Sequence, residues 1–449
     1  MGNSIWHFIS KILPSRVLTS SAVGVFALCS LMQVQAAEAT ASPALPAPSV
    51  LRKLSLADAQ RIAFQRNWDL LAAKVDVDMA TAQKIVARQF PNPTLSVSTE
   101  QISLDSHPNS TLSGNGVWAR SYDTVFAIGQ LFEIGGKRQN RKVSAEAGLH
   151  AAEARFEDAH RVLNQAVSKA YIETLLAEAS VTILSDSAKS LRQEAQIADT
   201  RLNAGDISKA DKSQIEIAAE RLEMQAKAAQ ASATTSRIAV EVLLGDPHPT
   251  GKWAPGDTLD SLAGQTTLAG QATPGAPRPD LLAAEAAKAK ADAELRLQKA
   301  MRVPDPTVFL QYEHEQPDLP NTVGVGVSFP LPLWNRNRGG IASAKAAQDQ
   351  ARLFAEKVQA QIQADIAIAR NAYADASSRW QRHRDQIQPK SADVRQTVSF
   401  AYQRGGASLL DLLSAQRTDN EVRLATAQAA AETAKAAADL KAALNVGTR

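Results

Sequence analysis

The side chains that could do chemistry are scattered along this sequence of 449 residues and form no recognisable catalytic set. A Gly-x-Ser-x-Gly elbow, a phosphate-binding Walker loop and a His-Glu-x-x-His zinc motif are all missing from it. The histidines beyond residue 36 do not converge on a local metal site; they are His107, His150, His160, His248, His314 and His383. We therefore predict that the protein is not an enzyme and has neither a cofactor nor a resident metal.

One short stretch does group possible cation ligands. Glu313, His314 and Glu315 stand close to Asp318, near the tip of an expected hairpin. Carboxylates and imidazole are metal ligands, but the same residues are also common in solvated surface loops. We interpret the stretch as a solvated loop and not as a metal site.

A second pattern concerns two turns. A glycine, a serine and an aspartate follow two expected helices at one fixed spacing, as Gly205, Ser208 and Asp211 and again as Gly405, Ser408 and Asp411. Glycine permits a left-handed turn, and the serine can cap the helix that follows. The pattern indicates either helix-turn-helix punctuation alone or a repeated surface that another protein contacts.

Long helices must position these turns. The chain is rich in alanine and only 5% aromatic, which favours elongated helices over compact cores. Helices are expected over 55–88, 137–202 and 208–244, and from about residue 340 onward. A helix over 137–202 would be about 100 Å long, and no single globular core has that length. The helices are therefore expected to pack sideways as antiparallel coiled-coil-like pairs.

The strands pose a different problem. Residues 94–100 and 322–329 alternate apolar with small polar residues, and they belong to hairpins at about 93–131 and 306–331. Strands of about nine to eleven residues can cross a bilayer when tilted, but only within a closed barrel. Four strands cannot close a barrel, whereas three chains would supply twelve around a water-filled lumen. We predict a homotrimer that shares one transmembrane β-barrel.

The chain is also internally duplicated. Asp69 to Ala73 returns as Asp280 to Ala284, and Pro91-Asn92-Pro93-Thr94 returns as Pro304-Asp305-Pro306-Thr307. Each unit has a helix, a hairpin, a long helix, a turn and a helix, over 55–244 and again over 280–449. Residues 245–279 are rich in proline and glycine, which predicts an equatorial linker with neither helix nor sheet.

The N-terminal residues predict export from the cytoplasm. Residues 1–36 combine a basic start, an apolar stretch and a small-residue cleavage site, which is typical of a signal peptide; residues 37–54 then form an extended arm. The only cysteine, Cys29, lies in the signal, so the mature chain has no disulfide. Leu28 before it disfavours lipidation. Removing the signal takes away Lys11 and Arg16 and lowers the formal net charge from +3 to about +1, which does not support a nucleic-acid partner.

An aromatic residue followed by basic residues marks the end of each hairpin. Such a sequence suits the interface with lipid phosphates, although a solvated basic turn beside one packed aromatic ring would look the same. These candidate membrane-interface anchors are Phe132, Lys137, Arg138, Trp334, Arg336 and Arg338.

Taken together, these features resemble the TolC-like outer-membrane efflux protein family across nearly the whole mature chain. The resemblance is carried by 54–56, 91–93, 132–138, 202–206, 278–281 and 329–332. The stretches 134–138 and 335–339 are most similar to the branch that serves heavy-metal efflux, of the cobalt-zinc-cadmium type.

The resemblance implies a trimeric channel-tunnel in the outer membrane of a Gram-negative bacterium, with a periplasmic extension. It would conduct divalent heavy-metal cations passively from a proton-driven inner-membrane pump of the resistance-nodulation-division type and a periplasmic adaptor. The two turns would be the adaptor contact, and Asp393 would face a pore constriction. Gln396 stands where the family can have a second acid, and Asn67-Trp68 replaces the usual Asn-Pro.

Two alternatives remain open on the sequence. The same kind of channel could export drugs or proteins, since a water-filled lumen need not select its cargo. A protein of another class, a soluble periplasmic coiled-coil adaptor or scaffold, would also contain long helices.

Overall fold

The computed structural model describes residues 53–100, 123–265, 275–315 and 321–446, all within one compact unit, Val50–Arg449. The expected signal peptide with Cys29, most of the expected arm, His107 and Asp318 lie outside the described residues.

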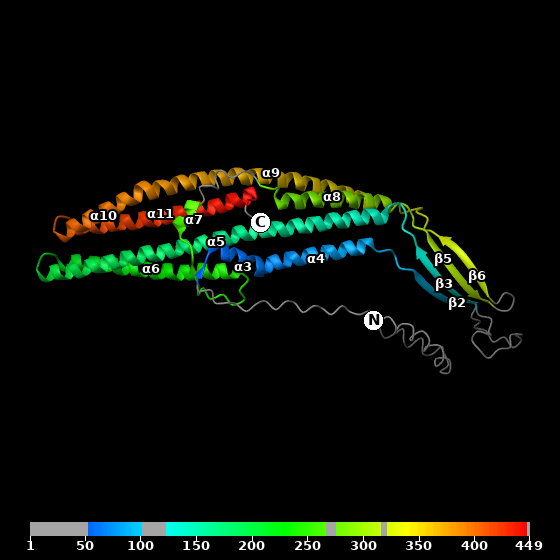
Figure 1. Ribbon diagram of the computed structural model, residues 1–449, viewed down its shortest axis with the longest axis horizontal. Helices are drawn as coiled ribbons and strands as arrows, with labels where there is room; N and C mark the ends of the chain where they lie inside the picture. Colours follow the sequence, from blue (N-terminus) through cyan, green and yellow to red (C-terminus); the bar gives the residue numbers. More distant parts are fainter. Residues whose placement is uncertain (1–52, 101–122, 266–274, 316–320, 447–449) are drawn as a thin grey trace, which may run out of the picture. The chain divides into compact units, whose positions relative to one another are not determined.

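Between residues 53 and 244, the described part of the chain contains four helices (Figure 1). They are α3 (Leu56–Arg66), α4 (Trp68–Arg88), α5 (Lys137–Asn203) and α6 (Lys209–Leu243). The expectation of one helix over 55–88 was wrong, because Asn67 ends α3 and begins α4. The Asn67 side chain accepts a hydrogen bond from the Leu70 amide at 3.0 Å and donates one to the Leu243 carbonyl at 2.9 Å. Both bonds hold the backbone in this break.

The second half repeats the pattern with one interruption. It consists of α8 (Pro279–Ala300), α9 (Arg338–Arg382), a π-helical turn (His383–Ile387), α10 (Gln388–Gln403) and α11 (Leu409–Leu444). Pro389 lies in the first turn of α10, where its missing N–H costs little. The long helix expected after Gly340 therefore continues past this proline through a π turn.

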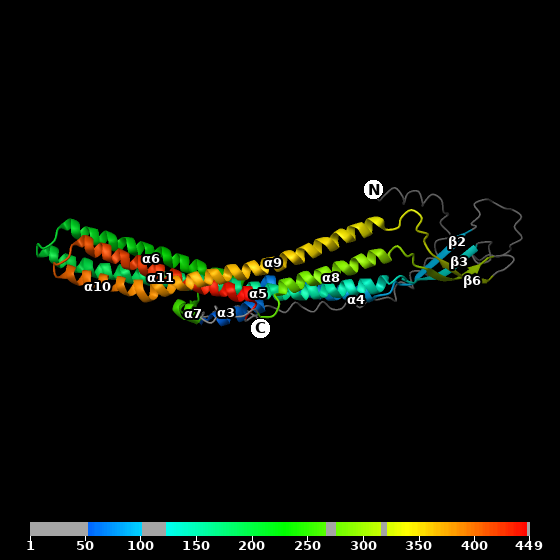
Figure 2. The same cartoon turned by 90° about the horizontal axis from the view of Figure 1, so that it is seen from above.

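The helices pack side by side, as predicted. α5 contacts α4, α6, α8 and α11, while α9 contacts α8 and α11. Figures 1 and 2 show α4 and α6 following one another along the single long α5. Many of the buried side chains between these helices are alanines, among them Ala430, Ala431 and Ala437. Small side chains let long helices approach closely along their whole length.

A four-stranded antiparallel sheet lies beyond the helix ends. Its strands are β2 (Thr94–Glu100), β3 (Asp123–Leu131), β5 (Thr307–His314) and β6 (Thr322–Ser328), in the order β2-β3-β5-β6. The two hairpins join through β3 and β5, with Ile128 opposite Leu310. Neither β2 nor β6 has a second partner strand among the described residues.

One face of this sheet is apolar and exposed. Val97, Leu310 and Val325 are on this face, and they are 57%, 49% and 75% exposed. The opposite face has mostly small or polar residues, such as Ser96 and Gly326, together with Val125 and Phe309. Exposed apolar side chains at alternate positions are typical of a strand whose one face meets lipid.

The region around 245–279 has more structure than the sequence predicted. Within it, β4 (Ala254–Pro255) pairs in parallel with β1 (Lys53–Leu54), and α7 (Leu259–Gln265) follows. The hydroxyl of Tyr171 on α5 donates to the Leu54 carbonyl at 2.8 Å and accepts from the Gly256 amide at 3.1 Å. Burial raises the pKa of Tyr171 to about 12. The linker is thus fastened to the middle of α5.

Candidate functional site

The first candidate site is the pair of turns where the long helices reverse. In the first turn, Gly205 adopts φ 81°, and its amide donates to the Leu202 carbonyl at 3.0 Å. The Asp206 amide donates to the Arg201 carbonyl at 2.9 Å. This is the Schellman arrangement, which satisfies the last carbonyls of α5 and favours glycine at the left-handed position.

The helix after each turn begins with a capping box. The Ser208 hydroxyl accepts from the Asp211 amide at 3.1 Å, and the Ser208 amide donates to the Asp211 carboxylate at 3.2 Å. Ser408 and Asp411 make the same two contacts at 3.2 and 3.1 Å. Hydrogen bonds from Ser408 lower the pKa of Asp411 below its ordinary value. The serines and aspartates therefore have a defined structural role, whatever else they contact.

The second turn has the same backbone as the first, and the two turns form one end of the molecule. Gly405 has φ 78°, and its amide donates to the Tyr402 carbonyl at 3.0 Å. Tyr402 is buried with Ala198, Ile215 and Leu412. Arg201 donates to the Tyr402 carbonyl at 3.0 Å, which fastens the two turns together. The result is a firm end surface whose caps are mostly exposed to solvent.

Sequence reasoning missed a buried carboxylate just above these turns. Glu194 on α5 is 7% exposed and accepts from Ser399 at 2.8 Å and from Gln403 at 3.1 Å, both on α10. Asp419 on α11 is also buried and pairs with Arg395 of α10 at 3.0 Å. These three polar contacts tie α10 to α5 and α11. An acid within a long charged helix gives no sequence signal that distinguishes it from a solvated one.

Asp393 lies on the exposed surface of α10. Its carboxylate has no hydrogen bond or ion pair with any of the residues that the structure describes, and Gln396 one turn later is exposed as well. A carboxylate that narrows a pore and attracts cations must be exposed and unpaired, and Asp393 meets both conditions. Its role in a pore stays a prediction.

The second candidate site is the junction between the sheet and the helices, where one predicted anchor was wrong. Lys137 is 7% exposed, and its ammonium lies 2.7 Å from the Asp305 carboxylate and 2.5 Å from the Val303 carbonyl. Asp305 also accepts from the Ile134 amide at 2.9 Å. Because Lys137 is buried and paired within the chain, it cannot reach a lipid phosphate.

Arg138 also makes internal contacts. Its Nε and Nη2 atoms donate to the Arg88 carbonyl at 2.9 and 2.7 Å, and its guanidinium lies over the Phe90 ring at 3.9 Å. Arg138 thus caps the end of α4 while staying partly exposed. The four remaining predicted anchors are exposed, with Trp334 the most so at 93%; they are Phe132, Trp334, Arg336 and Arg338.

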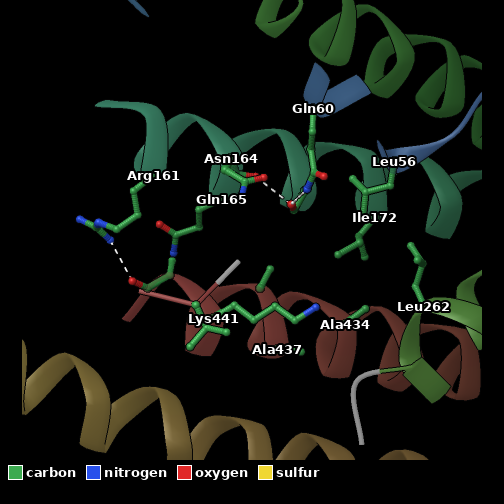
Figure 3. Close-up of a pocket in the computed structure, with 14 residues that line it drawn as sticks. Leu56, Gln60, Arg161, Asn164, Gln165, Ile172, Leu262, Ala434, Ala437 and Lys441 are labelled. Atoms are coloured by element: carbon green, nitrogen blue, oxygen red, sulfur yellow. Dashed lines mark hydrogen bonds between the residues drawn. The ribbon is translucent and has the colours of Figure 1, made fainter. Parts of the chain in front are cut away.

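A cavity of about 420 Å³, lined by both apolar and polar side chains, lies beside the linker, between α3, α5, α7 and α11. Figure 3 shows Gln60, Arg161 and Lys441 around it. Gln60 donates to Ser168 at 3.0 Å, and Arg161 donates to the Ala442 carbonyl at 3.3 Å. The lining contains no carboxylate, histidine or cysteine, so it offers neither a general base nor a metal-ligand set.

Within the described ranges, no group of three His, Cys, Asp or Glu side chains is placed to hold a metal ion. Glu313 and His314 lie at the end of β5, with Nδ1 of His314 3.4 Å from the Asn321 amide oxygen. None of the helices described is both long and apolar enough to cross a membrane.

The outer membrane efflux protein family model matches residues 60–246 and 276–446. The chain belongs to the outer membrane efflux protein family. Members of this family are channel proteins of the Gram-negative outer membrane with a periplasmic tunnel.

Two curated family members resemble the chain over most of its length. The cobalt-zinc-cadmium resistance protein CzcC of Cupriavidus metallidurans is 25% identical over 384 residues, covering 83% of this chain and 85% of that protein. The nickel-cobalt-cadmium resistance protein NccC of Alcaligenes xylosoxydans xylosoxydans is 23% identical over 370 residues, covering 82% and 78%.

Solved structures of the family confirm the mainly helical fold with its small sheet. The outer-membrane channel OprN superposes with a TM-score of 0.72 at 19% identity, covering 88% of this chain and 90% of that one. CusC superposes with a TM-score of 0.71 at 19% identity, covering 87% and 92%. At these identities the likeness concerns the fold alone.

Proposed function

We propose that this family member is the outer-membrane channel of a tripartite efflux system and passively conducts divalent heavy-metal cations. One observation carries the channel role: a four-stranded sheet with an exposed apolar face and two open edges is attached to the ends of long helices. Unpaired strand edges are tolerated in lipid only when another strand closes them. Three copies would supply twelve strands and a water-filled lumen.

The internal repeat supplies the register of that closure. Within one chain, β3 of the first repeat pairs with β5 of the second, and Ile128 lies opposite Leu310. By their places in the two hairpins, Ile128 corresponds to Val327 and Leu310 to Val97. If every repeat meets the next in the same way, Val327 of one copy lies opposite Val97 of the following copy. The polar face, which includes Ser96, would then line the lumen.

The two ends of the helices would have different surroundings. The junction with its exposed Trp334 would lie at the membrane surface, and the helices would extend into the periplasm. The exposed turns at Gly205 and Gly405 would then meet a periplasmic adaptor, which connects the channel to an inner-membrane pump. No enzymatic step is required of the channel, since the pump would supply the energy.

The heavy-metal cargo is supported by the names of the relatives. CzcC and NccC are both resistance proteins for divalent metals. A conduit need not hold its ion, because a wet pore conducts and the pump can select. The exposed Asp393, repeated three times around the axis of a trimer, would favour cations at a constriction.

Deleting the gene in a strain without other channels of this family tests the cargo. Sensitivity to zinc, cobalt and cadmium should rise, and the plasmid-borne gene should restore tolerance. Unchanged metal tolerance combined with increased drug sensitivity would instead identify a drug-export channel. Recovery of the protein from the periplasm without detergent would contradict the channel itself and favour a scaffold.

Gly405→Ala tests the adaptor contact. A Cβ at Gly405 meets nothing within 4 Å, so the cost is only that of the left-handed φ of 78°, about 1 kcal/mol. The turn should shift, and site-specific crosslinking to the adaptor should fall. Gly406→Ala is the matched control, because Gly406 does not have a positive φ. Equal crosslinking in both variants would contradict the contact.

A further inference from the structure

A second hollow lies where the end of α8 meets the junction after β6. It has a volume of about 570 Å³ and is lined by Lys299, Arg302, Val303, Leu331, Pro332, Leu333 and Arg336. Lys299, Arg302 and Arg336 are all exposed. None of these three side chains has an ion pair or hydrogen bond with the described residues. Three positive charges therefore surround one hollow without a counter-charge.

The chain has two junctions between a hairpin and a long helix: the first lies between β3 and α5, and the second lies between β6 and α9. At the first junction, acidic side chains of the chain itself neutralise the basic ones. There, Lys137 pairs with Asp305 at 2.7 Å, and Arg141 forms a two-pronged pair with Glu133 at 2.5 and 2.8 Å. The second junction has no acid corresponding to Glu133, because the sequence from Phe329 to Gln348 contains neither aspartate nor glutamate. The residue that corresponds to Asp305 in the other repeat is Asn92, which has no charge. The two junctions occupy corresponding places in the two repeats, but only the first has acidic partners for its basic residues. An anion from outside the chain could therefore neutralise the second junction.

The hollow also has an apolar wall, and its position is informative. Leu331 and Leu333 follow Val327 and Phe329 at every second position of the sequence, and Val327 lies on the apolar face of the sheet. They are 64% and 62% exposed, next to Trp334. A cationic wall beside an exposed apolar wall, at the edge of an apolar strand face, matches the two parts of a phospholipid.

We propose that this hollow binds the headgroup of an anionic phospholipid from the periplasmic leaflet. The phosphate lies among Lys299, Arg302 and Arg336, and the acyl chains run along Leu331 and Leu333. The lipid supplies to the second junction the negative charge that Asp305 and Glu133 supply to the first. This inference rests on the proposed insertion of the sheet in the outer membrane.

Binding of phosphatidylglycerol to the purified, delipidated channel in neutral detergent tests the proposal. The variant Lys299→Gln/Arg302→Gln/Arg336→Gln should lose about a hundredfold in affinity, since each basic residue near an anionic lipid contributes several-fold. The matched control is Lys189→Gln/Arg221→Gln/Lys227→Gln, which removes three exposed charges elsewhere and should bind as wild type. Equal binding by both variants overturns the site.

Two further measurements distinguish a lipid from a free phosphate as the ligand, and distinguish failure of this inference from failure of the proposed function. Leu331→Ser/Leu333→Ser should weaken phosphatidylglycerol binding but not glycerol phosphate binding; glycerol phosphate binding as tight as the lipid overturns the lipid assignment. Fractionation of the wild-type protein is done in parallel. A channel found in the outer membrane that binds no phosphatidylglycerol overturns this inference alone, whereas a wild-type protein absent from that membrane overturns the proposed function with it.

Discussion

A disulfide between copies would test the shared sheet most directly. The variant Val97→Cys/Val327→Cys, in a Cys29→Ser background, places one thiol on each open edge of the sheet. The repeat symmetry puts these two residues opposite one another in neighbouring copies, as Ile128 and Leu310 are within one chain. Both positions are more than half exposed, at 57% and 58%, so oxidation should reach them.

The expected separations decide which thiols can bond. Residues directly opposite in an antiparallel pair have Cα atoms about 4.5 to 5.5 Å apart, within the range of a disulfide. Within one chain, β2 and β6 are separated by β3 and β5, and the register puts Val97 level with Val323, four residues from Val327. Three strand spacings across the sheet and four residues along it place Val97 and Val327 about 20 Å apart. Any disulfide between them must therefore join two copies.

The assay is non-reducing electrophoresis of boiled outer membranes after mild oxidation. Covalent dimers and trimers should appear, and reduction should remove them. Val97→Cys/Val325→Cys is the matched control, because its thiols would lie on a diagonal about 7 to 8 Å apart. Stronger crosslinking in the control than in the test pair would refute the register. A trimer that crosslinks in neither variant would refute the shared sheet.

Three further changes test the junction, the cap and the pore. Asp305→Ala leaves the buried Lys137 ammonium without its partner and should lower the free energy of unfolding by about 3 kcal/mol, measured by thermal or denaturant unfolding. Ser408→Ala should return the pKa of Asp411 toward its ordinary value. Since that pKa is lowered in the folded protein, the cap stabilises at higher pH and is lost as the pH falls through it, so the variant should show less acid destabilisation in pH-dependent unfolding. Asp393→Ala should reduce cation conductance and cation preference in planar bilayers.

Each of these changes has a control or a contradicting result. Glu146→Ala breaks the pair with Lys84, which has the same 2.7 Å separation as Lys137 and Asp305 but a solvent-exposed carboxylate, and it should lower the free energy of unfolding far less than Asp305→Ala does. Equal losses in the two variants would show that burial of Lys137 does not matter. An unchanged acid profile for Ser408→Ala, or unchanged conductance for Asp393→Ala beside Gln396→Ala, would refute the respective assignments.

Much of the fold could be predicted from sequence because its signals are local. The alternation of Val323, Val325 and Val327 marks a strand, and the glycine-to-serine spacing marks each turn, since capping joins residues only three apart. The break between α3 and α4 at Asn67 and the π turn before α10 were not predicted, because local sequence patterns do not report contacts between distant residues. Asn67 is held by the Leu243 carbonyl, which is 176 positions away in the sequence.

The candidate sites also differ in whether their residues are close together or far apart in the sequence. The turns were found because one short pattern builds each of them. Lys137 was wrongly predicted to be exposed because its partner, Asp305, belongs to the other repeat and lies 168 positions away. Without that partner, the sequence around Lys137 predicts a lysine in solvent. Glu194 was missed because its partners Ser399 and Gln403 lie on another helix. Long-range pairing of charges has no periodicity that a single sequence reveals.

The internal repeat also predicts which basic residues stay without an acidic partner in the proposed trimer. In one chain, Asp305 of the second repeat closes the junction of the first by pairing with Lys137. The corresponding residue of the first repeat is Asn92, in Pro91-Asn92-Pro93, and it would meet the second junction of the neighbouring copy. An amide can hydrogen-bond there but cannot neutralise Arg338 or its neighbours. Ring closure would therefore complete the sheet and still leave each second junction positive, as an anionic lipid requires.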